Sequence, residues 1–286
     1  MFHITYKTKQ LIKAALKEDL GHGDVTTRAL IPGPVSAEAV LLSKDRGVLA
    51  GNLVFEEVFR SLSPRVRFRW LTKEGSAISP DQRVCTVIGQ LQVLLAAERV
   101  ALNFISHLSG IATATSHYVK KTAGTKAKIY DTRKTMPLWR ELQKEAVKAG
   151  GGMNHRAGLW DQALVKDNHW QFVKNSHAVQ SAIKRLRHHR WMVEISKENV
   201  HELPSILEAR PAVVLLDNFK PRELKRLVTF IRRHPNGKML LEASGGITLQ
   251  NVRQFAKTGV DRISIGALTH SAPAFDFSLE IASTHQ

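Results

Sequence analysis

Residues 129–170 read IYDTRKTMPLWRELQKEAVKAGGGMNHRAGLWDQALVKDNHW. Within this stretch, short apolar segments end in charged clusters at residues 131–134, 154–156 and 166–169. Cationic side chains at strand ends and glycine-rich turns are how proteins build pockets for small molecules that carry several negative charges. We therefore interpret this stretch as the centre of an anion pocket that the rest of the chain supports.

Strand-like and helical patterns alternate around this stretch, from residue 122 onward. The predicted strands are Lys128–Tyr130, Ala163–Val165, Trp191–Ile195, Val213–Leu216, Met239–Leu241 and Ile263–Ile265. The predicted helices are Leu138–Ala149, Ala178–His188, Glu198–Glu208, Pro221–Arg233 and Leu249–Thr258. This alternation favours parallel βα units, whose right-handed connections wind them into a barrel or an open sheet.

Polar residues follow these predicted strands at their C-terminal ends. They are residues 131–134, Lys166 and Asp167, Glu194, Asp217 and Asn218, 242–246, and 264–266. In a βα barrel these ends converge on one face, which is where such folds place their active sites. The pattern therefore favours an active site over a merely solvated edge.

The first 121 residues have a different pattern. Helices are predicted at 7–18 and Leu53–Ser61, and strands at Ala37–Leu42, Val66–Leu71 and Val84–Ile88. From Gln92 to Lys121 the pattern is helical, with a predicted break at Gly110. His22 and Asp24 lie in a glycine-containing turn, where a structural role outweighs that of a catalytic pair. This mixture predicts a small α+β unit.

The chain is strongly basic. It has 42 Lys and Arg against 25 Asp and Glu, which gives a formal net charge of +17 with histidine neutral. Such a balance favours an anionic partner, which can be a phosphorylated metabolite, a nucleic acid or an acidic membrane surface. The alternative for any single run of charges is the solvated face of a helix, and we prefer it for the most basic run, Lys184–Arg190.

Cysteine content and hydropathy indicate the cellular compartment in which the protein is expected. The single cysteine, Cys85, excludes an internal disulfide framework and fits a reducing compartment. Its apolar neighbours predict that it fills the core and is not a nucleophile. No apolar run approaches the length of a membrane span, and the N-terminal residues lack the apolar segment of a signal peptide. We expect a cytoplasmic protein without a membrane partner.

Two glycine-containing turns predict a phosphate site. Residues 243–248, ASGGIT, follow a predicted strand and open a predicted helix, so that backbone N–H groups and the helix dipole can hold an anion. Residues 264–270, SIGALTH, repeat this arrangement after the next strand. Phosphate sites in βα barrels often lie in the last two loops, which makes the pair more informative than either turn alone.

The cationic residues exceed the needs of one phosphate. They are Arg99, Arg133, His155, Arg156 and Lys166. A ligand with two carboxylates beside a phosphorylated ribose accounts for the whole set, because arginine binds planar carboxylates with two hydrogen bonds. A salt bridge to Glu98 remains an alternative for Arg99. No hydrolase-type nucleophile and base, zinc-ligand cluster or phosphate-binding P-loop is present in the sequence.

A carboxylate in so basic a site needs a reason. Asp217 ends a predicted strand, and binding sugar hydroxyls or Mg²⁺ with phosphates would supply that reason. A salt bridge from Asp217 to Lys166 or Arg133 is the structural alternative.

At these residues the sequence resembles the quinolinate phosphoribosyltransferase family. The matching segments cover nearly the whole chain: EDLGHGDVTT (18–27), GVLAG (47–51), LLAAERVALNFISHLSGIATAT (94–115), YDTRKTMP (130–137), GGGMNHRAGLWDQALVKDNH (150–169), LLDNF (215–219), LEASGGIT (241–248) and ISIGALTHS (263–271). Together they are highly specific, although none of them would be so alone.

The resemblance implies a fold and a reaction. The fold would be an α/β sandwich over residues 1–122, an incomplete βα barrel over 123–270 of the type II phosphoribosyltransferase kind, and a segment 271–286 that returns to the first domain. The enzyme would be a pentosyltransferase, nicotinate-nucleotide diphosphorylase (carboxylating). With Mg²⁺, it would convert quinolinate and phosphoribosyl pyrophosphate into nicotinate mononucleotide, pyrophosphate and carbon dioxide. A homodimer is implied, in which Arg99 reaches the neighbouring active site.

The resemblance also assigns site residues. Those at quinolinate-binding positions are Arg99, Thr132, Arg133, His155, Arg156 and Lys166. Those expected around phosphoribosyl pyrophosphate are Lys134, Glu194, Asp217, Ser244, Gly245, Ser264, Ile265, Gly266 and His270. Asp217 and Glu194 are the expected metal ligands.

The chain departs from the family pattern at several positions. Ser196 occupies the place of a second glutamate in the strand that carries Glu194, so either Glu194 serves from one step deeper or Asp217 acts alone. Met136 and Leu138 replace small residues after the DTRK motif, and residues 90–92 lack the usual arginine. These departures leave two alternatives open. One is a related, ModD-like pyrophosphorylase acting on another aromatic carboxylate, and the more remote one is a basic nucleic-acid-binding protein.

Overall fold

The computed structural model describes residues 3–170, 172, 178, 181 and 191–285. The chain divides into two compact units, the first comprising Met1–Ser116, Met136–Gly151 and Ser271–Gln286, and the second His117–Thr135 and Gly152–His270. Residues 136–151, which we expected in the barrel, therefore belong to the first unit. The predicted helix Ala178–His188 lies outside the described residues except for positions 178 and 181, and the basic run Lys184–Arg190 lies wholly outside them.

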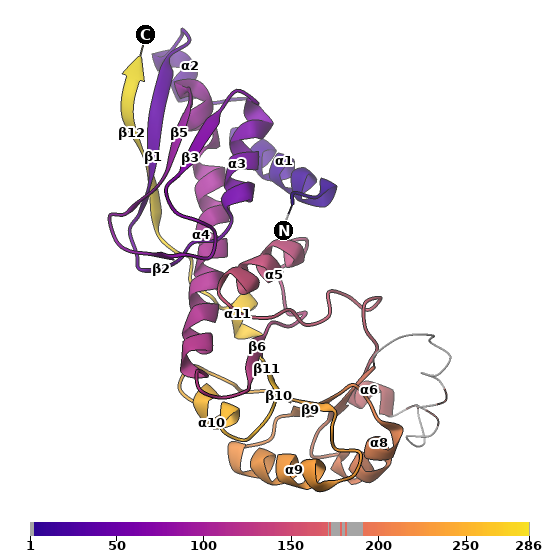
Figure 1. The fold of residues 1–286 in the computed structure, drawn as a ribbon. Coiled ribbons are helices and arrows are strands. Elements are labelled where there is room, and N and C mark those ends of the chain that lie inside the picture. The colour runs from indigo at the N-terminus through magenta and orange to yellow at the C-terminus, as the bar shows by residue number, and fades with distance from the viewer. Residues whose placement is uncertain (1–2, 171, 173–177, 179–180, 182–190, 286) are drawn as a thin grey trace. The chain divides into compact units, whose positions relative to one another are not determined.

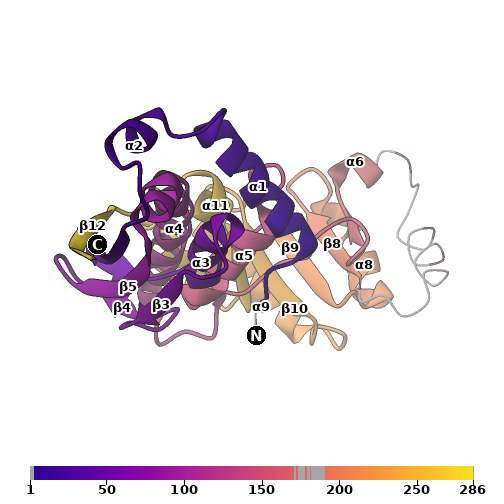
Figure 2. The ribbon, with the colours of Figure 1, turned by 90° about the horizontal axis from the view of Figure 1, so that it is seen from above.

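The first unit contains an antiparallel sheet covered on one side by helices. Its strands are β1 (Ser36–Ser43), β3 (Arg67–Trp70), β5 (Arg83–Gln90) and β12 (Phe277–His285), in the order β12-β1-β5-β3. Helices α1 (Tyr6–Leu20), α3 (Asn52–Leu62) and α4 (Leu91–Lys121) lie along one side of this sheet (Figures 1 and 2). The remaining elements are α2 (Val25–Leu30), α5 (Arg140–Ala149), and the short strands β2 (Gly47–Val48) and β4 (Ala77–Ile78), which pair with each other. The chain's last strand, β12, pairs antiparallel with β1 over residues 277–285.

The core of this unit explains why its elements form. Helix α3 buries Phe55 and Phe59, whose rings meet Phe68 of β3 at centroid distances of 6.4 and 5.8 Å. Cys85 on β5 is fully buried, and loss of solvation raises the pKa of its thiol to about 12. The prediction that Cys85 fills the core is confirmed.

Helix α4 runs without the break predicted at Gly110. A Cβ atom on Gly110 would lie only 2.0 Å from the carbonyl oxygen of Pro273, in the segment that leads to β12. The glycine is therefore needed for close packing and does not end the helix. Gly150, just after α5, has the same role, because a Cβ there would lie 2.3 Å from the carbonyl oxygen of Ala112 on α4.

The second unit is built on a parallel sheet. Its strands are β6 (Lys128–Tyr130), β7 (Leu164–Val165), β8 (Met192–Ile195), β9 (Val213–Asp217), β10 (Leu240–Ser244) and β11 (Arg262–Ser264), in the order β6-β11-β10-β9-β8-β7. The helical elements are α6 (Asp167–Trp170), η1 (Val200–Glu202), α8 (Leu203–Ala209), α9 (Pro221–Arg233), α10 (Val252–Ala256) and α11 (Ala267–His270). Figure 1 shows α8, α9 and α10 on the outer side of the sheet.

The predicted α/β fold with an incomplete barrel is confirmed. All six predicted strands are present within a few residues of the expected positions, and α9 has the predicted bounds. Strands β6 and β7 are the two edges of the sheet, and β6 gains one further parallel bridge from Tyr130 to Met153. Two predicted helices are shorter than expected, because Glu198–Glu208 divides into η1 and α8, and Leu249–Thr258 contains only the five-residue α10.

Membrane insertion of a helix can be assessed for the described part of the chain. No helix there combines the length and the apolar character that crossing a bilayer would require.

Candidate active site

A cavity of about 620 Å³ lies in the second unit, at the C-terminal ends of its strands. It is lined by all but one of the residues predicted from the sequence: Thr132, Arg133, Lys134, His155, Arg156, Lys166, Glu194, Asp217, Ser244, Gly245, Ser264, Ile265, Gly266 and His270. The exception, Arg99, belongs to the first unit and is exposed on α4.

The loop after β6 is tied to the segment 154–156. Asp131 is fully buried and accepts a hydrogen bond of 2.8 Å from the backbone N–H of His155. The next backbone N–H, that of Arg156, donates to Nδ1 of His155 at 2.8 Å. Because both segments line the cavity, these bonds hold Arg133 and Arg156 on the same side of it.

Arg156 is the most buried of the four Lys and Arg residues that line the cavity, with 8% of its surface exposed. Its Nη1 donates to the carbonyl oxygen of Gln162 at 2.9 Å. Burial is the main cause that lowers the pKa of its guanidinium, and the positive charge of Arg133 lowers it further. An anion bound here would relieve this repulsion, so the arrangement favours an anionic ligand.

Lys166 and Glu194 form an ion pair of 3.0 Å at the ends of β7 and β8. The lysine side chain is 43% exposed and the glutamate side chain 12% exposed. Lys166 therefore pairs with Glu194, and the proposed salt bridge from Asp217 to Lys166 is absent. Asp217 instead accepts a hydrogen bond of 2.6 Å from the side-chain amide of Asn218. Within the described residues Asp217 makes no ion pair, which leaves its charge available to a ligand.

The turn after β10 is shaped by glycines. Gly245 and Gly246 have φ angles of 91° and 60°, which side chains rarely permit. A Cβ on Gly245 would lie 2.1 Å from Oδ1 of Asn218, so this position also requires glycine for space. Such a turn directs backbone N–H groups toward an anion.

The helix dipole contributes less at this turn than the sequence suggested. Helix α10 begins only at Val252, and α11 contains only four residues. The backbone N–H of Thr248 donates to the side chain of Asn251 and is already used. An anion at this end of the cavity would therefore depend on the N–H groups of the glycine turn and on side chains.

The last loop places Lys134 beside His270. A Cβ on Gly266 would lie 3.0 Å from both Cδ of Lys134 and Nε2 of His270, so the two side chains flank this glycine. The hydroxyl of Thr269 donates to the carbonyl oxygen of Lys134 at 2.6 Å and fixes the lysine backbone. Lys134 is exposed.

Ser196 does not line the cavity. Its hydroxyl and its backbone N–H both bond to Oδ1 of Asn199, at 3.4 and 2.7 Å. Glu194, two residues earlier on β8, does line the cavity. The two alternatives from the sequence are that Glu194 contacts the ligand from one step deeper on the strand, or that Asp217 acts alone. The placement of Glu194 in the cavity lining is consistent with the first.

Sequence reasoning missed two residues that line the cavity, Leu164 and Leu215. Asn218, Gly246, Ile247, Thr248 and Ala267 also line it and lie within the polar strand ends and glycine turns predicted from the sequence, although none was singled out as a site residue. Asn218 adopts the left-handed conformation that asparagine tolerates, with φ 59°. The leucines carry no sequence signal that separates them from ordinary core residues.

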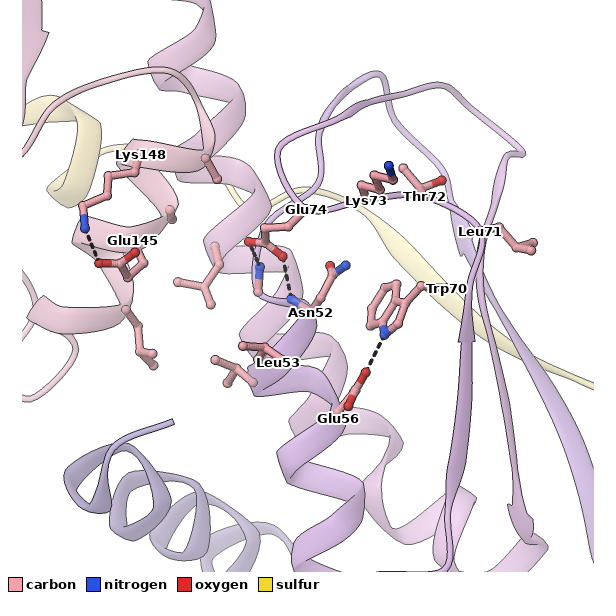
Figure 3. Close-up of a pocket in the computed structure, with 16 residues that line it drawn as sticks. Asn52, Leu53, Glu56, Trp70, Leu71, Thr72, Lys73, Glu74, Glu145 and Lys148 are labelled. Carbon is pink, nitrogen blue, oxygen red and sulfur yellow. Dashed lines mark hydrogen bonds and ion pairs between the residues drawn. The ribbon is translucent and has the colours of Figure 1, made fainter. Parts of the chain in front are cut away.

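The first unit contains a second cavity, of about 660 Å³ (Figure 3). Its charged lining residues are Glu56, Lys73, Glu74, Glu145 and Lys148, three acidic and two basic. Several already have structural partners: Glu74 accepts hydrogen bonds from the backbone N–H groups of Gly51 and Asn52, and Glu145 pairs with Lys148 at 2.6 Å. The cavity of the second unit carries four Lys and Arg residues against two carboxylates and is the better candidate for an anionic substrate.

Comparisons with known proteins show the family of the chain. The chain matches the family models "Quinolinate phosphoribosyl transferase, N-terminal domain" at residues 24–109 and "Quinolinate phosphoribosyl transferase, C-terminal domain" at residues 111–280. It is 40% identical to the nicotinate-nucleotide pyrophosphorylase [carboxylating] of Mycobacterium leprae over 96% of each chain.

Two solved structures show the same fold. That of NadC from Streptococcus pyogenes has a TM-score of 0.92 at 34% identity and covers 100% of this chain and 99% of its own. That of the nicotinate-nucleotide pyrophosphorylase from Francisella tularensis has a TM-score of 0.88 at 35% identity and covers 96% of both chains. The chain therefore belongs to the quinolinate phosphoribosyltransferase family.

Proposed function

We propose that the protein transfers phosphoribosyl from phosphoribosyl pyrophosphate to quinolinate, with loss of carbon dioxide, to give nicotinate mononucleotide for NAD biosynthesis. The observation that carries the proposal is the composition of one cavity, which Arg133, Lys134, Arg156 and Lys166 line together with the glycine turns at Gly245 and Gly266. Relatives that match along nearly the whole chain are named nicotinate-nucleotide pyrophosphorylase [carboxylating], which supports the proposal.

The two carboxylates of quinolinate would bind at the side formed by Arg133, Arg156 and Lys166. Guanidinium groups bind carboxylates through paired, charge-assisted hydrogen bonds, which fix the plane of the pyridine ring. Fixing this plane aims the ring nitrogen at C1 of the ribose, and positioning of this kind supplies a large part of the rate enhancement in a two-substrate reaction.

Phosphoribosyl pyrophosphate would bind at the other side of the cavity. The turns at Gly245 and Gly266 offer backbone N–H groups to the 5′-phosphate, and Lys134 and His270 lie where the pyrophosphate can be held. As the bond from C1 to pyrophosphate breaks, positive charge develops on the ribose and negative charge on the leaving group. Lys134 would stabilise the leaving group, and the carboxylates of Asp217 and Glu194 would stabilise the ribose.

No covalent enzyme intermediate is required. The pyridine nitrogen attacks C1 of the ribose, and the bond to pyrophosphate breaks. The ring nitrogen then carries a positive charge, so the bond from C2 to its carboxylate can break with its electron pair held beside that charge. Carbon dioxide leaves, and C2 takes up a proton. The protein's contribution is to orient the substrates and stabilise charge.

The cavity suits Mg²⁺, which we propose as the metal of the reaction. Glu194 and Asp217 line the same cavity, and Mg²⁺ typically binds through one or two carboxylates together with substrate phosphates and water. Bound Mg²⁺ would neutralise charge on the pyrophosphate.

We further propose a homodimer in which each active site takes Arg99 from the other chain, and a cytoplasmic location. The exposure of Arg99 on α4 supports the first proposal, because an exposed arginine is accessible to a second chain. The single, buried Cys85 supports the second, since the protein needs no oxidising compartment.

The test is turnover by the purified protein with phosphoribosyl pyrophosphate, Mg²⁺ and either quinolinate or nicotinate. We expect nicotinate mononucleotide from quinolinate and no comparable rate from nicotinate, which lacks the second carboxylate. Turnover of nicotinate or of another aromatic acid without turnover of quinolinate would reject the carboxylating assignment and favour a related pyrophosphorylase.

A further inference from the structure

Glu242 is a buried carboxylate beneath the cavity that the mechanism above does not use. It lies on β10, has no exposed surface, and is opposite Leu215 of β9 in the register of the sheet. Ser244, two residues later, and Leu215 both line the cavity. Because residues two apart on a strand face the same side, Glu242 points to the cavity side of the sheet, one step deeper than Ser244.

In the described part of the chain, the ion-pair partner of the Glu242 carboxylate is His155. Its Oε1 lies 3.4 Å from Nε2 of His155, and neither of its oxygens has a hydrogen bond of ordinary geometry. Its register neighbour on β11, Arg262, holds its guanidinium over the ring of Tyr130 instead, 4.8 Å from the ring centroid. A buried carboxylate without donors costs several kcal/mol, so its retention at this position calls for a role other than stability.

The hydrogen bonds of His155 indicate what this role is. Nδ1 of His155 accepts the backbone N–H of Arg156 at 2.8 Å, so the ring proton is on Nε2 and faces Glu242. The ring therefore connects the floor of the cavity to the backbone of the segment that carries Arg156. If the proton moved to Nδ1, the ring and the N–H of Arg156 would both be donors, and this connection would be lost.

We propose that Glu242 is a positioning residue for the dicarboxylate side of the cavity. Because its Oε1 lies 3.4 Å from Nε2, its charge attracts the ring proton to that nitrogen and so selects the tautomer of His155 that holds the backbone of Arg156. This sets the place of the Arg156 guanidinium. In other proteins a carboxylate beside one ring nitrogen of a histidine orients the ring in the same way, so that the other ring nitrogen can act in catalysis or bind a metal. The inference rests on the proposed function, because it assumes that Arg156 binds a carboxylate of quinolinate.

The test compares Glu242→Leu and Glu242→Gln with the wild-type protein. Leucine removes the acceptor and keeps an apolar volume, whereas glutamine keeps a carbonyl oxygen that can still accept from Nε2. We expect Glu242→Leu to raise the KM for quinolinate about tenfold or more, by analogy with the loss of other groups that orient a histidine, and the KM for phosphoribosyl pyrophosphate to stay within about twofold. Glu242→Gln should retain most of the quinolinate affinity.

Thermal stability provides a second readout, because Glu242→Leu should weaken quinolinate binding without lowering the stability of the protein. Replacing a buried carboxylate that lacks donors by leucine should leave the midpoint of thermal unfolding unchanged or raise it. The matched control is Glu56→Leu in the first unit, where the buried carboxylate accepts a hydrogen bond of 2.6 Å from Nε1 of Trp70. That control should lower the unfolding midpoint without changing the ratio of the two Michaelis constants.

Nitrogen-15 spectra of the histidine rings test the tautomer directly. The His155 signals, assigned by their loss in His155→Gln, should show the proton on Nε2 in the wild-type protein and a mixture or the other tautomer in Glu242→Leu. An unchanged quinolinate KM in Glu242→Leu, or a wild-type His155 protonated at Nδ1 alone, would overturn the inference. Arg156→Ala separates this result from a failure of the proposed function: if it too leaves the quinolinate KM unchanged, the assignment of Arg156 to quinolinate is wrong.

Discussion

Arg156 shows at the scale of a single residue how the fold prepares a site for an anion. One nitrogen of its guanidinium is held by the carbonyl of Gln162, and burial, followed by the charge of Arg133, lowers its pKa. A group held in this way gains most from an added negative charge. The sequence predicted Arg156 through its cationic cluster. It could not predict that the neighbouring residue His155 contacts Glu242, because these two residues are 87 positions apart, as 242 − 155 shows.

The first prediction concerns the two sides of the cavity. Arg156→Ala should raise the KM for quinolinate about 100-fold, since it removes a charge-assisted pair from a desolvated site, and should change the KM for phosphoribosyl pyrophosphate far less. Arg253→Ala is the matched control, because Arg253 bonds to the carbonyl of Lys121 and does not line the cavity. Initial rates at varied concentrations of each substrate measure both constants. A larger effect on phosphoribosyl pyrophosphate would reverse our division of the cavity.

The second prediction concerns the carboxylate at the end of β9. Asp217→Asn keeps the size of the side chain and removes its charge, which should lower kcat about 100-fold or more and raise the Mg²⁺ concentration needed for half-maximal rate. Ser196→Glu should have little effect on the Mg²⁺ requirement, because Ser196 bonds to Asn199 and does not line the cavity. A Mg²⁺ titration of each variant distinguishes the two positions. Unchanged kcat in Asp217→Asn would remove this residue from the site.

At the scale of elements, the sequence predicted regular strands well and connections poorly. The six strands of the second unit follow from apolar runs, and their polar ends identify the cavity. The apparent break at Gly110 was wrong because the reason for the glycine is Pro273, which is distant in the sequence. The short α10 has a similar cause: Asn251 bonds to Thr248 and Gly246, so a turn replaces the first helical residues that the apolar pattern suggested.

The segment before α5 contains a strained residue. Leu138 has φ 67°, and 87% of its surface is exposed. A left-handed conformation costs a residue with a side chain about 1–2 kcal/mol. Replacing Leu138 by glycine would remove this cost, but glycine loses more chain entropy on folding, which would offset about half of the gain. This strain accompanies the departure from the small residue that is usual at this place in the family.

The third prediction follows from this strain. Leu138→Gly should raise the free energy of unfolding by about 0.5–1 kcal/mol. Leu138→Ala is the control, because alanine retains the unfavourable conformation and should not stabilise the protein. Denaturant unfolding of the three proteins gives the comparison. If Leu138→Ala were as stable as Leu138→Gly, the gain in the free energy of unfolding would come from loss of the exposed side chain and not from relief of strain.

At the scale of the whole molecule, most of the excess positive charge lies outside the cavity. The cavity contains four Lys and Arg residues against two carboxylates, whereas the chain carries a net charge of +17. Composition alone therefore indicated an anionic partner but could not separate a metabolite from a nucleic acid. The two-unit architecture and the specific site residues followed from the family resemblance, because no periodic pattern predicts that the last strand joins the first sheet.

The fourth prediction tests the shared active site. Arg99→Ala and Asp217→Ala should each be nearly inactive alone. If each site combines Arg99 of one chain with Asp217 of the other, subunit exchange in an equal mixture should restore about one quarter of wild-type activity, since half the dimers are mixed and one of their two sites is intact. Activity of the mixture no greater than that of the separate variants, after exchange has been shown, would reject the shared site.

The central claim is that this cavity joins ribose to quinolinate and releases its 2-carboxylate. The most direct measurement uses quinolinate labelled in that carboxyl group and follows labelled carbon dioxide and nicotinate mononucleotide in the same reaction. Equal amounts of the two products, formed only when phosphoribosyl pyrophosphate and Mg²⁺ are present, are the predicted result. Retention of the label in the product, or release of labelled carbon dioxide without phosphoribosyl pyrophosphate, would contradict it.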